Sequence, residues 1–301
     1  MLVRHGNASL PGVPSVEPDA SAAAHGPEGV GEDWLVTRQV PRLVATDLDG
    51  TIVPWDGAVT DRTVAALRAV EGLGVPVVFV TGRPPRWMGD VAERTGHTGV
   101  AVCANGALLY DLHSEQVVDT FPLAVEIGLD VARRLRSALP DIAFAVETAE
   151  GFAHEETYLP RWDVGTAREV AHIDRIYGAP AVKLLARHEA MGSDDLLAAA
   201  RQVVGDLVEL THSSTSGLLE ISAAGVSKAS TLARLCAQRG IDATDVVAFG
   251  DMPNDLPMLA WAGRSYGVAG AHPDVLAAVD HVVDAPEDDG VARELERLFD
   301  L

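Results

Sequence analysis

Most of the chain alternates between short apolar runs and longer segments in which apolar residues recur every three or four positions. The apolar runs at 42–46, 76–80 and 99–103 predict buried β-strands, because they are rich in β-branched residues and bounded by Gly or Pro. The segments 61–73 and 85–95 have the period of amphipathic helices. Strands that are apolar on both faces and alternate with helices are typical of a parallel sheet covered on both sides, so we predict an α/β fold with a Rossmann-like parallel sheet.

The middle of the chain has a different pattern. Residues 107–121 predict a β-hairpin, and a new unit then begins with a helix near 124–139. Strands are predicted at 142–147, 181–186 and 206–211, with a helix at 193–204. We interpret 122–216 as an inserted α+β cap domain.

The last part of the chain returns to the first pattern. It predicts a strand at 218–222, a helix at 226–239, a strand at 245–249, a helix at 254–262, two short strands and a terminal helix. The sheet domain therefore comprises 40–121 and 217–301, because the junctions of the insertion then fall on surface loops.

Composition bears on the N-terminal segment and on the cellular compartment of the protein. Residues 1–39 are rich in Ala, Pro, Gly and Ser and show no regular period, which predicts a disordered N-terminal extension. No apolar run approaches the roughly 20 residues that span a bilayer, and the first thirty residues lack the apolar region of a signal peptide. Cys103 and Cys236 lie far apart in apolar segments, which favours buried thiols and a cytoplasmic protein.

The charge balance limits the partners. The chain has 44 acidic and 23 basic side chains, a formal net charge of −21. Nucleic acids and anionic membranes are bound by basic surfaces, so we expect neither as a partner. A small anionic substrate requires a local cation, backbone N–H groups or a metal.

Two acidic residues follow the first predicted strand, in the run Asp47-Leu48-Asp49-Gly50-Thr51. Open α/β sheets bind ligands at the carboxyl ends of their strands. There, one carboxylate can attack a phosphorus atom while the other transfers the proton of the leaving oxygen. A strand-end turn with two solvated carboxylates is the alternative interpretation.

The next two strand ends carry polar residues. Thr81-Gly82-Arg83 follows the second strand, and its hydroxyl, backbone N–H and following helix start can bind a dianionic oxygen group. Asn105-Gly106 follows the third strand, where it supplies another polar group to the same edge or only the turn into the hairpin.

A lysine lies where a helix of the last segment begins. Lys228 and Lys183 are the only lysines of the chain. A lone lysine at a helix N-terminus opposes the helix dipole, so binding an anion explains Lys228 better than helix stability does. A solvated surface lysine is the alternative.

A fourth strand end carries Gly250-Asp251-Met252-Pro253-Asn254-Asp255. Carboxylate and amide oxygens that face Asp47 suit Mg²⁺, which binds hard oxygen ligands. Part of this run can instead cap the following helix. Four strand ends thus supply a nucleophile, an oxyanion pocket, a cation and a metal ligand.

These residues, in this order, resemble the haloacid dehalogenase (HAD) superfamily, and more narrowly its Cof-type (subclass IIB) phosphatases. The resemblance runs from Leu43 to the C-terminus. It implies a phosphatase with a cap inserted between the second and third motifs. The loop Ala271-His272-Pro273 departs from the family pattern, and we expect His272 near the rim of the site.

The resemblance also implies roles for the motif residues. Asp47 would be phosphorylated, and Asp49 would act as general acid and then as general base. Thr81, the Gly82 backbone and Lys228 would hold the phosphoryl group. The side chains of Asp47 and Asp251 and the carbonyl of Asp49 would bind Mg²⁺. The supporting residues would be Arg83, Asn105, Asn254 and Asp255.

The second acid, Asp49, narrows the reaction within the superfamily. Dehalogenases lack it and transport ATPases carry Thr there, so the resemblance implies hydrolysis of a small phosphorylated metabolite, a sugar phosphate or a nucleotide-like cofactor. A phosphomutase is an alternative, since the same two acids serve both reactions. A non-catalytic binding protein on this scaffold is another, and the complete motif set argues against it.

The predicted insertion offers fewer signals. Its candidates for substrate contact lie in one loop-like segment with polar and aromatic side chains. They are His154, Glu155, Tyr158, Arg161 and Trp162. For Lys183, within a strand-like run, a structural role and a position facing the cleft are both open.

Overall fold

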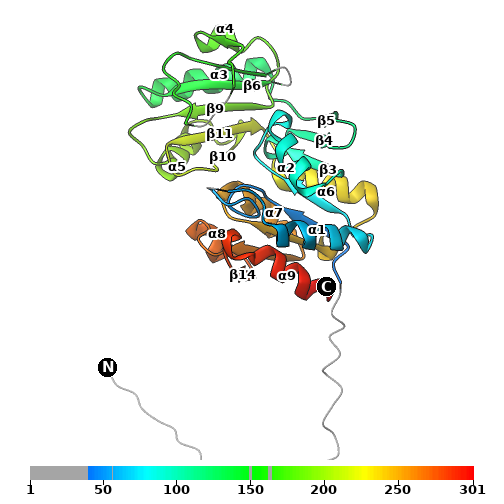
Figure 1. Cartoon of the computed structure of the whole chain (residues 1–301). Helices are drawn as coiled ribbons and strands as arrows, with labels where there is room; N and C mark the ends of the chain where they lie inside the picture. The colour runs from blue at the N-terminus through cyan, green and yellow to red at the C-terminus, as the bar shows by residue number, and fades with distance from the viewer. Residues whose placement is uncertain (1–39, 56, 149–150, 162–164) are drawn as a thin grey trace, which may run out of the picture. The chain divides into compact units, whose positions relative to one another are not determined.

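The computed structural model describes residues 40–55, 57–148, 151–161 and 165–301. The predictions for residues 1–39 and for Trp162 lie outside the described residues. Within them, the chain forms two sheets, each with its own helices (Figure 1).

The first sheet has eight strands in the order β14-β13-β12-β1-β2-β3-β4-β5. Its first six strands are parallel, and β4 and β5 form the predicted hairpin. The strands are β1 (Leu43–Thr46), β2 (Val77–Val80), β3 (Val100–Cys103), β4 (Leu108–Asp111), β5 (Gln116–Thr120), β12 (Val246–Gly250), β13 (Arg264–Val268) and β14 (His281–Val283).

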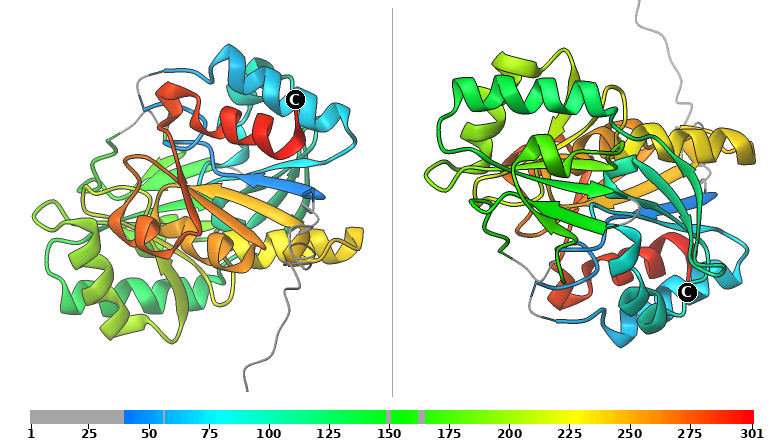
Figure 2. Two further views of the ribbon diagram at one scale, coloured as in Figure 1. Left: turned by 90° about the horizontal axis from the view of Figure 1, so that it is seen from below. Right: turned by 90° about the horizontal axis from the view of Figure 1, so that it is seen from above.

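Helices cover both faces of this sheet, as Figure 2 shows. Helix α9 lies beside α1 on one face, and α6 packs against α7 on the other. The helices of this part are α1 (Asp61–Gly72), α2 (Gly89–Thr95), α6 (Lys228–Arg239), α7 (Leu256–Trp261), α8 (Pro273–Ala278) and α9 (Gly290–Phe299). Because both faces are covered, the central strand β1 is buried along its whole length, which explains its continuous apolar sequence.

The second sheet has six strands in the order β10-β11-β9-β6-β7-β8, all antiparallel except for the pair β7 and β8. Its strands are β6 (Ala143–Thr148), β7 (Gly151–His154), β8 (Glu169–Val170), β9 (Lys183–Arg187), β10 (Val208–Thr211) and β11 (Leu218–Ala223). Its helices are α3 (Val125–Ala138), α4 (Ile173–Ile176) and α5 (Ser193–Val204). This is the predicted α+β cap.

The period of two along the cap strands separates the two faces of the cap sheet. Phe144 and Val146 of β6 and Leu184 of β9 belong to the apolar core shared with α3 and α5. The alternate residues of β9, Lys183 and Leu185, line the space on the opposite face.

The structure corrects one strand assignment. The strand predicted at 218–222 as the start of the returning parallel sheet is β11, and it pairs antiparallel with β9 and β10 in the cap. The sequence of a buried strand does not identify its partner, so the apolar pattern alone gave no sign of the correct sheet.

Most other predicted elements are confirmed to within about two residues, although β7, β8, α4 and α8 were not predicted. Two predicted helices each begin with a short 3₁₀ turn, η1 (Pro85–Trp87) and η4 (Pro253–Asp255). Cys103 and Cys236 are free, buried thiols. Among the described residues, none of the helices has the length and apolar character needed to cross a membrane.

Candidate active site

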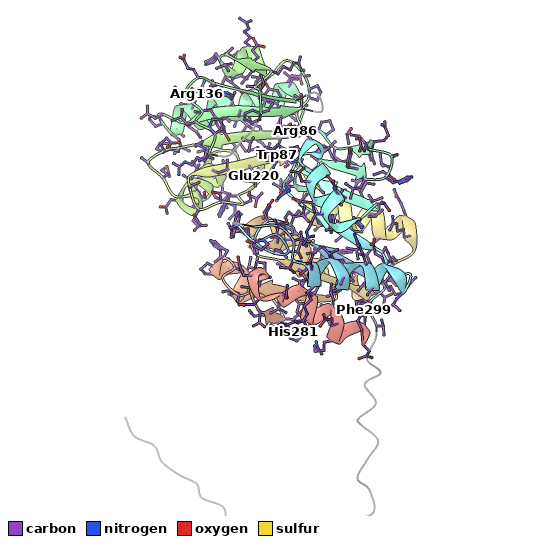
Figure 3. The ribbon with its side chains drawn as sticks, in the orientation of Figure 1. Arg86, Trp87, Arg136, Glu220, His281 and Phe299 are labelled. Carbon is purple, nitrogen blue, oxygen red and sulfur yellow. The ribbon has the colours of Figure 1, made fainter. Side chains whose placement is uncertain are left out.

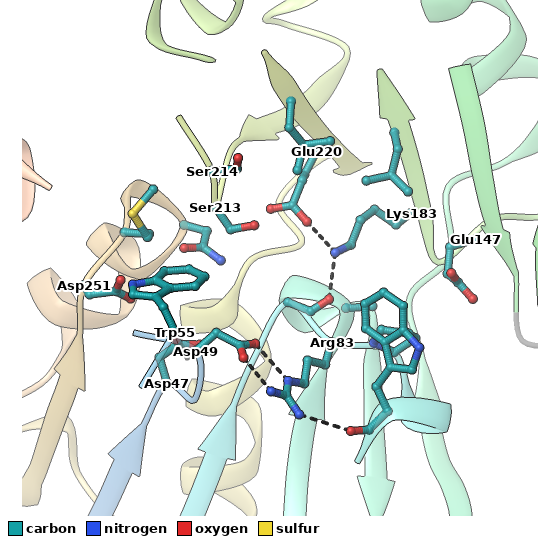
Figure 4. A pocket seen from close by; sticks show the side chains of 18 of the residues that line it. Asp47, Asp49, Trp55, Arg83, Glu147, Lys183, Ser213, Ser214, Glu220 and Asp251 are labelled. Carbon is teal, nitrogen blue, oxygen red and sulfur yellow. Dashed lines mark hydrogen bonds and ion pairs between the residues drawn. The ribbon is translucent and has the colours of Figure 1, made fainter. Parts of the chain in front are cut away.

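The carboxyl ends of β1, β2, β3 and β12 meet at one edge of the parallel sheet (Figure 4). Asp47 follows β1, Thr81 follows β2, Asn105 lies after β3 and Asp251 follows β12. All four side chains are buried. A cavity of about 810 Å³ lies between this edge and the cap sheet, and Asp47 and Asp251 line it.

Lys228 is fully buried between two carboxylates. Its Nζ lies 2.6 Å from Oδ1 of Asp47 and 2.7 Å from Oδ1 of Asp255. Burial by itself lowers the pKa of Lys228, but Asp255 and Asp47 outweigh that effect and raise the pKa above its usual range. The lysine is therefore a permanent cation beside the Asp47 carboxylate.

A single lysine does not balance the acidic groups around it. Burial raises the pKa of Asp47 to about 7, with Lys228 opposing the shift and Asp255 and Asp49 adding to it. The pKa of Asp251 is likewise well above its usual range, because of burial and the nearby carboxylates of Asp47 and Asp255. Carboxylates in this position are costly to ionise without another cation.

The donor atoms of this cluster fit a small divalent cation. Carboxylate oxygens of Asp47, Asp251 and Asp255 all lie within 4.8 Å of one another. Asp255 is fully engaged, since Oδ1 accepts from Lys228 and Oδ2 accepts the backbone N–H groups of Asp251 and Met252, each at 3.1 Å. Oδ1 of Asp251 accepts from the Thr51 hydroxyl. Within the described residues, one oxygen each of Asp47 and Asp251 is left for a metal, and two carboxylates are a typical protein contribution to a Mg²⁺ site.

Gly50 makes room for this cluster. Its φ is +80°, and a Cβ at this position would lie 2.3 Å from Oδ2 of Asp251. The glycine of the Asp47-to-Thr51 run is therefore required by the close approach of the Asp251 carboxylate as well as by its backbone conformation.

Asp49 is held by an arginine, in contrast to Asp47. Its Oδ2 accepts from Nε of Arg83 at 2.8 Å and its Oδ1 from an Nη of Arg83 at 2.5 Å. Figure 4 shows this two-point pairing. The Asp49 side chain is 39% exposed, so this carboxylate lies at the entrance and the Asp47 carboxylate lies inside.

The loop after β2 packs against two amides. The Thr81 hydroxyl accepts the backbone N–H of Arg83 at 3.0 Å. Nδ2 of Asn254 donates to Oδ1 of Asn105 at 3.1 Å, and a Cβ at Gly82 would lie 3.2 Å from that same oxygen. Oδ1 of Asn254 is buried with no hydrogen-bond partner among the described residues. Gly82 and Asn254 line the same cavity as Asp47.

The Asn105-Gly106 turn fixes the position of helix α6, which begins with Lys228. Gly106 has φ +100°, and a Cβ there would lie 2.1 Å from the Ser227 carbonyl oxygen. The Thr231 hydroxyl donates to the Gly106 carbonyl at 2.6 Å. The turn therefore packs directly on the first turn of α6, which carries Lys228 into the site.

The cap contributes a second wall of the cavity. Figure 3 shows Glu220 of the cap near Arg86 and Trp87 of the parallel-sheet part. Lys183 Nζ lies 2.5 Å from Glu220 and donates to the Gly82 carbonyl at 2.7 Å. The cap residues that line the cavity are Glu147, Phe152, Lys183, Leu185, Ser213, Ser214, Thr215, Leu218 and Glu220.

Among the described residues, the predicted specificity residues His154, Tyr158 and Arg161 do not line this cavity. Tyr158 is fully buried and packs near Phe152. Arg161 forms an exposed ion pair with Glu189 at 2.9 Å. Nδ1 of His154 lies 2.7 Å from the backbone carbonyl oxygen of Glu155.

Glu155 has a structural position. Its carboxylate accepts the backbone N–H groups of Phe144 and Ile173 and pairs with Arg136. The carboxylate therefore holds cap backbone together and leaves no free oxygen for a substrate.

The alternation of residues along the cap strands indicates which cap residues line the cavity. Lys183 and Leu185 are two positions apart on β9, and they pair in register with Glu147 of β6 and Glu220 of β11. Residues two apart, and residues directly opposite on a neighbouring strand, share one face of a sheet. The sequence alone does not give the strand pairing, so these residues were missed.

Comparisons with known proteins agree with this arrangement. Residues 44–295 match the haloacid dehalogenase-like hydrolase family. The chain is 29% identical to a phosphoglycolate phosphatase of Methanopyrus kandleri, over 86% of this chain and 97% of that protein. It is 24% identical to the Bacillus subtilis 5-amino-6-(5-phospho-D-ribitylamino)uracil phosphatase YcsE, over 84% and 94% of the two chains.

The fold also matches solved structures. The sugar phosphatase BT4131 of HAD subclass IIB superposes with a TM-score of 0.72 at 18% identity, covering 86% of this chain and 99% of that one. The family match covers both flanks of the parallel sheet and the whole cap. The chain therefore belongs to the haloacid dehalogenase-like hydrolases, among the Cof-type phosphatases of that superfamily.

Proposed function

We propose that the protein is a Mg²⁺-dependent phosphatase that hydrolyses a small phosphorylated metabolite through an aspartyl-phosphate at Asp47. One observation carries the proposal. Asp47 has one oxygen bound to the buried Lys228, and its second oxygen lies in the same cavity as Asp251. A carboxylate held in this way can attack a phosphoryl group that its neighbouring cation binds.

The first half of the reaction forms the phosphoenzyme. The free oxygen of Asp47 attacks phosphorus, the bond from phosphorus to the ester oxygen breaks, and Asp49 gives its proton to the departing oxygen. Lys228 and the loop of Thr81 and Gly82 hold the phosphoryl oxygens. Arg83 donates to both oxygens of Asp49, so this pairing has to loosen when Asp49 gives up its proton.

The second half regenerates the enzyme. Asp49 takes a proton from a water molecule, whose oxygen attacks phosphorus and displaces the Asp47 carboxylate. Inorganic phosphate then leaves. In this half Asp49 starts ionised, and the two-point pairing with Arg83 suits that form and orients it.

The metal completes the charge balance of the site. Asp47 and Asp251 would hold Mg²⁺ through one oxygen each, and the predicted third ligand is the carbonyl of Asp49. The bound ion would supply a positive charge that neutralises the carboxylates and the phosphoryl group as it transfers. Asp255 and Asn254 would position Lys228, the Asp251 loop and Asn105 around it.

The cavity favours a leaving group that is uncharged and rich in hydroxyls. Its three cationic side chains are all engaged, Arg83 with Asp49, Arg86 with Glu147 and Lys183 with Glu220. A carboxylate on the leaving group, as in phosphoglycolate, would meet Glu147 and Glu220 without an available cation among the described lining residues.

The neutral groups of the cavity complement a polyol or a flat ring. Ser213, Ser214 and Thr215 offer hydroxyls, and Trp55 and Trp87 offer aromatic faces. A sugar phosphate or a nucleotide-like cofactor has these features, and the relative YcsE is named for a substrate that carries a ribityl chain.

The test is phosphate release from a panel of phosphorylated metabolites, with wild type and Asp47→Asn. We expect turnover of sugar phosphates and of p-nitrophenyl phosphate by wild type, and a loss of at least about 10⁴-fold in the variant. Thermal unfolding checks that the variant is folded. Activity retained by a folded Asp47→Asn protein would rule out the nucleophile. Phosphate release that requires a bisphosphate activator would instead indicate a phosphomutase.

A further inference from the structure

A second group of possible ligands lies outside the proposed active site, where cap and parallel-sheet part meet. Asp194 is in the first turn of α5, and His212 follows β10, so both belong to the cap. His272 precedes α8 in the parallel-sheet part. One ligand atom from each lies within 4.8 Å of the other two.

The three side chains converge on one point. Nε2 of His212 lies 2.9 Å from Oδ1 of Asp194, and Nε2 of His272 lies 3.3 Å from both oxygens of that carboxylate. Two ligands of a tetrahedral Zn²⁺ ion with bonds near 2.0–2.1 Å are about 3.3 Å apart. The two separations from Asp194, 2.9 and 3.3 Å, are close to that value, and the two histidine nitrogens lie within 4.8 Å of each other.

Burial distinguishes this group from ordinary surface histidines. The side chain of His212 is 1% exposed and that of His272 is 9% exposed, whereas Asp194 is 66% exposed. Nδ1 of His212 is buried with no hydrogen-bond partner among the described residues. The buried His212 and the half-buried His272 both face a single accessible carboxylate, which leaves an open side through which an ion can enter.

We propose that Asp194, His212 and His272 form a second metal site, which binds a divalent cation of the Zn²⁺ type and joins the cap to the parallel-sheet part. Imidazole and carboxylate ligands suit Zn²⁺, and three protein ligands leave its fourth position to water. The hard, all-carboxylate cluster at Asp47 suits Mg²⁺ instead, so the two sites differ in ligand chemistry.

His272 also has a partner for the nitrogen that would not bind the ion. Its Nδ1 now accepts the backbone N–H of Asp274 at 3.2 Å and lies 3.9 Å from the Asp274 carboxylate. Cation binding requires Nε2 without its proton, so the ring proton moves to Nδ1, and the Nδ1–H can then donate a hydrogen bond to the Asp274 carboxylate. The bond from the backbone N–H is lost in the exchange.

The proposed metal site lies next to two loops that line the active-site cavity. Ser213, Ser214 and Thr215 directly follow His212, and Gly270 lies two residues before His272, and all four line the cavity. The backbone N–H of His272 donates to the Asp251 carbonyl at 2.8 Å. A bound cation would therefore fix two loops of the cavity rim, one from each side.

The experiment uses the full chain, first stripped of bound metal and then saturated with Mg²⁺. Zn²⁺ is added, and its binding is followed by calorimetry and by the temperature of thermal unfolding. We expect one Zn²⁺ per chain and a rise in the unfolding temperature. Asp194→Asn, His212→Asn and His272→Asn should each weaken binding by at least about 100-fold, and Asp274→Asn by about tenfold. Asn keeps the capacity to cap α8 at position 272.

Two further proteins serve as controls. His113→Asn removes an exposed histidine of the β4–β5 turn and should bind Zn²⁺ like wild type. Asp251→Asn should also keep the ion, which separates this site from the carboxylate cluster. Co²⁺ in place of Zn²⁺ should give the visible absorption of a four-coordinate ion, and Asp194→Asn should lose it. Zn²⁺ binding that is absent in wild type, or unchanged in Asp194→Asn and His212→Asn, would overturn the proposal.

Discussion

The two parts of the molecule each bury one of the chain's two lysines, and the two lysines have different kinds of partners. Lys228 lies between Asp47 and Asp255, which belong to its own part of the structure. Lys183 lies on strand β9 of the cap and pairs with Glu220 of the cap. It also donates to the Gly82 carbonyl of the parallel-sheet part. Both partners of Lys228 lie in one packed core, whereas the bond from Lys183 to Gly82 exists only while the cap contacts the parallel-sheet part. The proposed function therefore assigns the chemistry to the parallel-sheet part and the choice of leaving group to the cap.

Replacing Lys228 tests the first half of this comparison and should have the largest effect. Lys228→Met leaves Asp47 and Asp255 buried without their cation, and breaking a buried ion pair from one side typically costs about 3–5 kcal/mol. We also expect kcat/KM to fall by at least about 10²–10³-fold on every phosphate ester, since a phosphoryl-binding cation is lost. Chemical denaturation and p-nitrophenyl phosphate hydrolysis measure the two effects.

Lys183→Met is the matched control for that variant, since it removes the other buried lysine. It should leave the hydrolysis of p-nitrophenyl phosphate within a few-fold of wild type. Equal losses of this activity in the two variants would contradict the assignment of the chemistry to Lys228 and its neighbours.

Removal of Mg²⁺ sharpens the comparison, because its proposed ligands all lie in the parallel-sheet part, whereas the proposed Zn²⁺ site takes ligands from both parts. We expect EDTA to abolish activity and Mg²⁺ to restore it. At 100 times its dissociation constant, Mg²⁺ should raise the unfolding temperature by roughly 5–10 °C. In Asp251→Asn most of this rise should disappear. An activity indifferent to chelation would exclude the metal role.

The same measurement has a predicted pH dependence. In the metal-free protein the pKa of Asp47 is raised to about 7, and that of Asp251 is raised as well. A metal binds the ionised carboxylates, so protons compete with it at and below pH 7. The rise in unfolding temperature caused by Mg²⁺ should therefore be larger at pH 8 than at pH 6. A larger effect at pH 6 would show that these carboxylates are not the ligands.

The same contrast explains what the sequence could predict. Asp47, Thr81, Asn105 and Asp251 each follow a buried strand, and parallel strands bring their carboxyl ends to one edge. Short contiguous motifs were therefore enough to bring these residues together. Their detailed pairing was not predictable, as the Arg83 bond to Asp49 depends on side-chain directions across the loop.

The cap offered no such rule. Lys183, Glu147 and Glu220 face the cavity because of antiparallel pairing between strands far apart in the sequence. Polar and aromatic residues such as Tyr158 were poor guides, since an aromatic ring in a small domain is often part of its core. β11 was assigned to the other sheet for the same reason, because pairing is decided by tertiary contacts.

Replacing cap residues that line the cavity should change which substrates are used, with a moderate effect. Glu220→Gln keeps the size of the side chain and removes the charge that pairs with Lys183, which leaves a cation available in the cavity. We expect KM for a sugar phosphate to rise by about threefold to tenfold and the relative use of phosphoglycolate to increase. Steady-state kinetics with both substrates measure the ratio, and p-nitrophenyl phosphate provides the control. A ratio that does not change would show that Lys183 and Glu220 do not contact the leaving group.

The smallest effect should come from Arg161, which sequence reasoning placed at the substrate. Its ion pair with Glu189 is about half exposed on both sides, with 45% and 52% of the two side chains accessible. Exposed pairs of this kind contribute between about 0 and 1 kcal/mol. Arg161→Ala should therefore change KM and kcat by less than about twofold for every substrate. Glu189→Ala is the matched control, since it removes the same pair from the other side. A tenfold rise of KM in Arg161→Ala but not in Glu189→Ala would mean that this segment of the cap reaches the substrate after all. In that case the substrate would be contacted when the cap lies differently against the parallel-sheet part, with Arg161 facing the cavity.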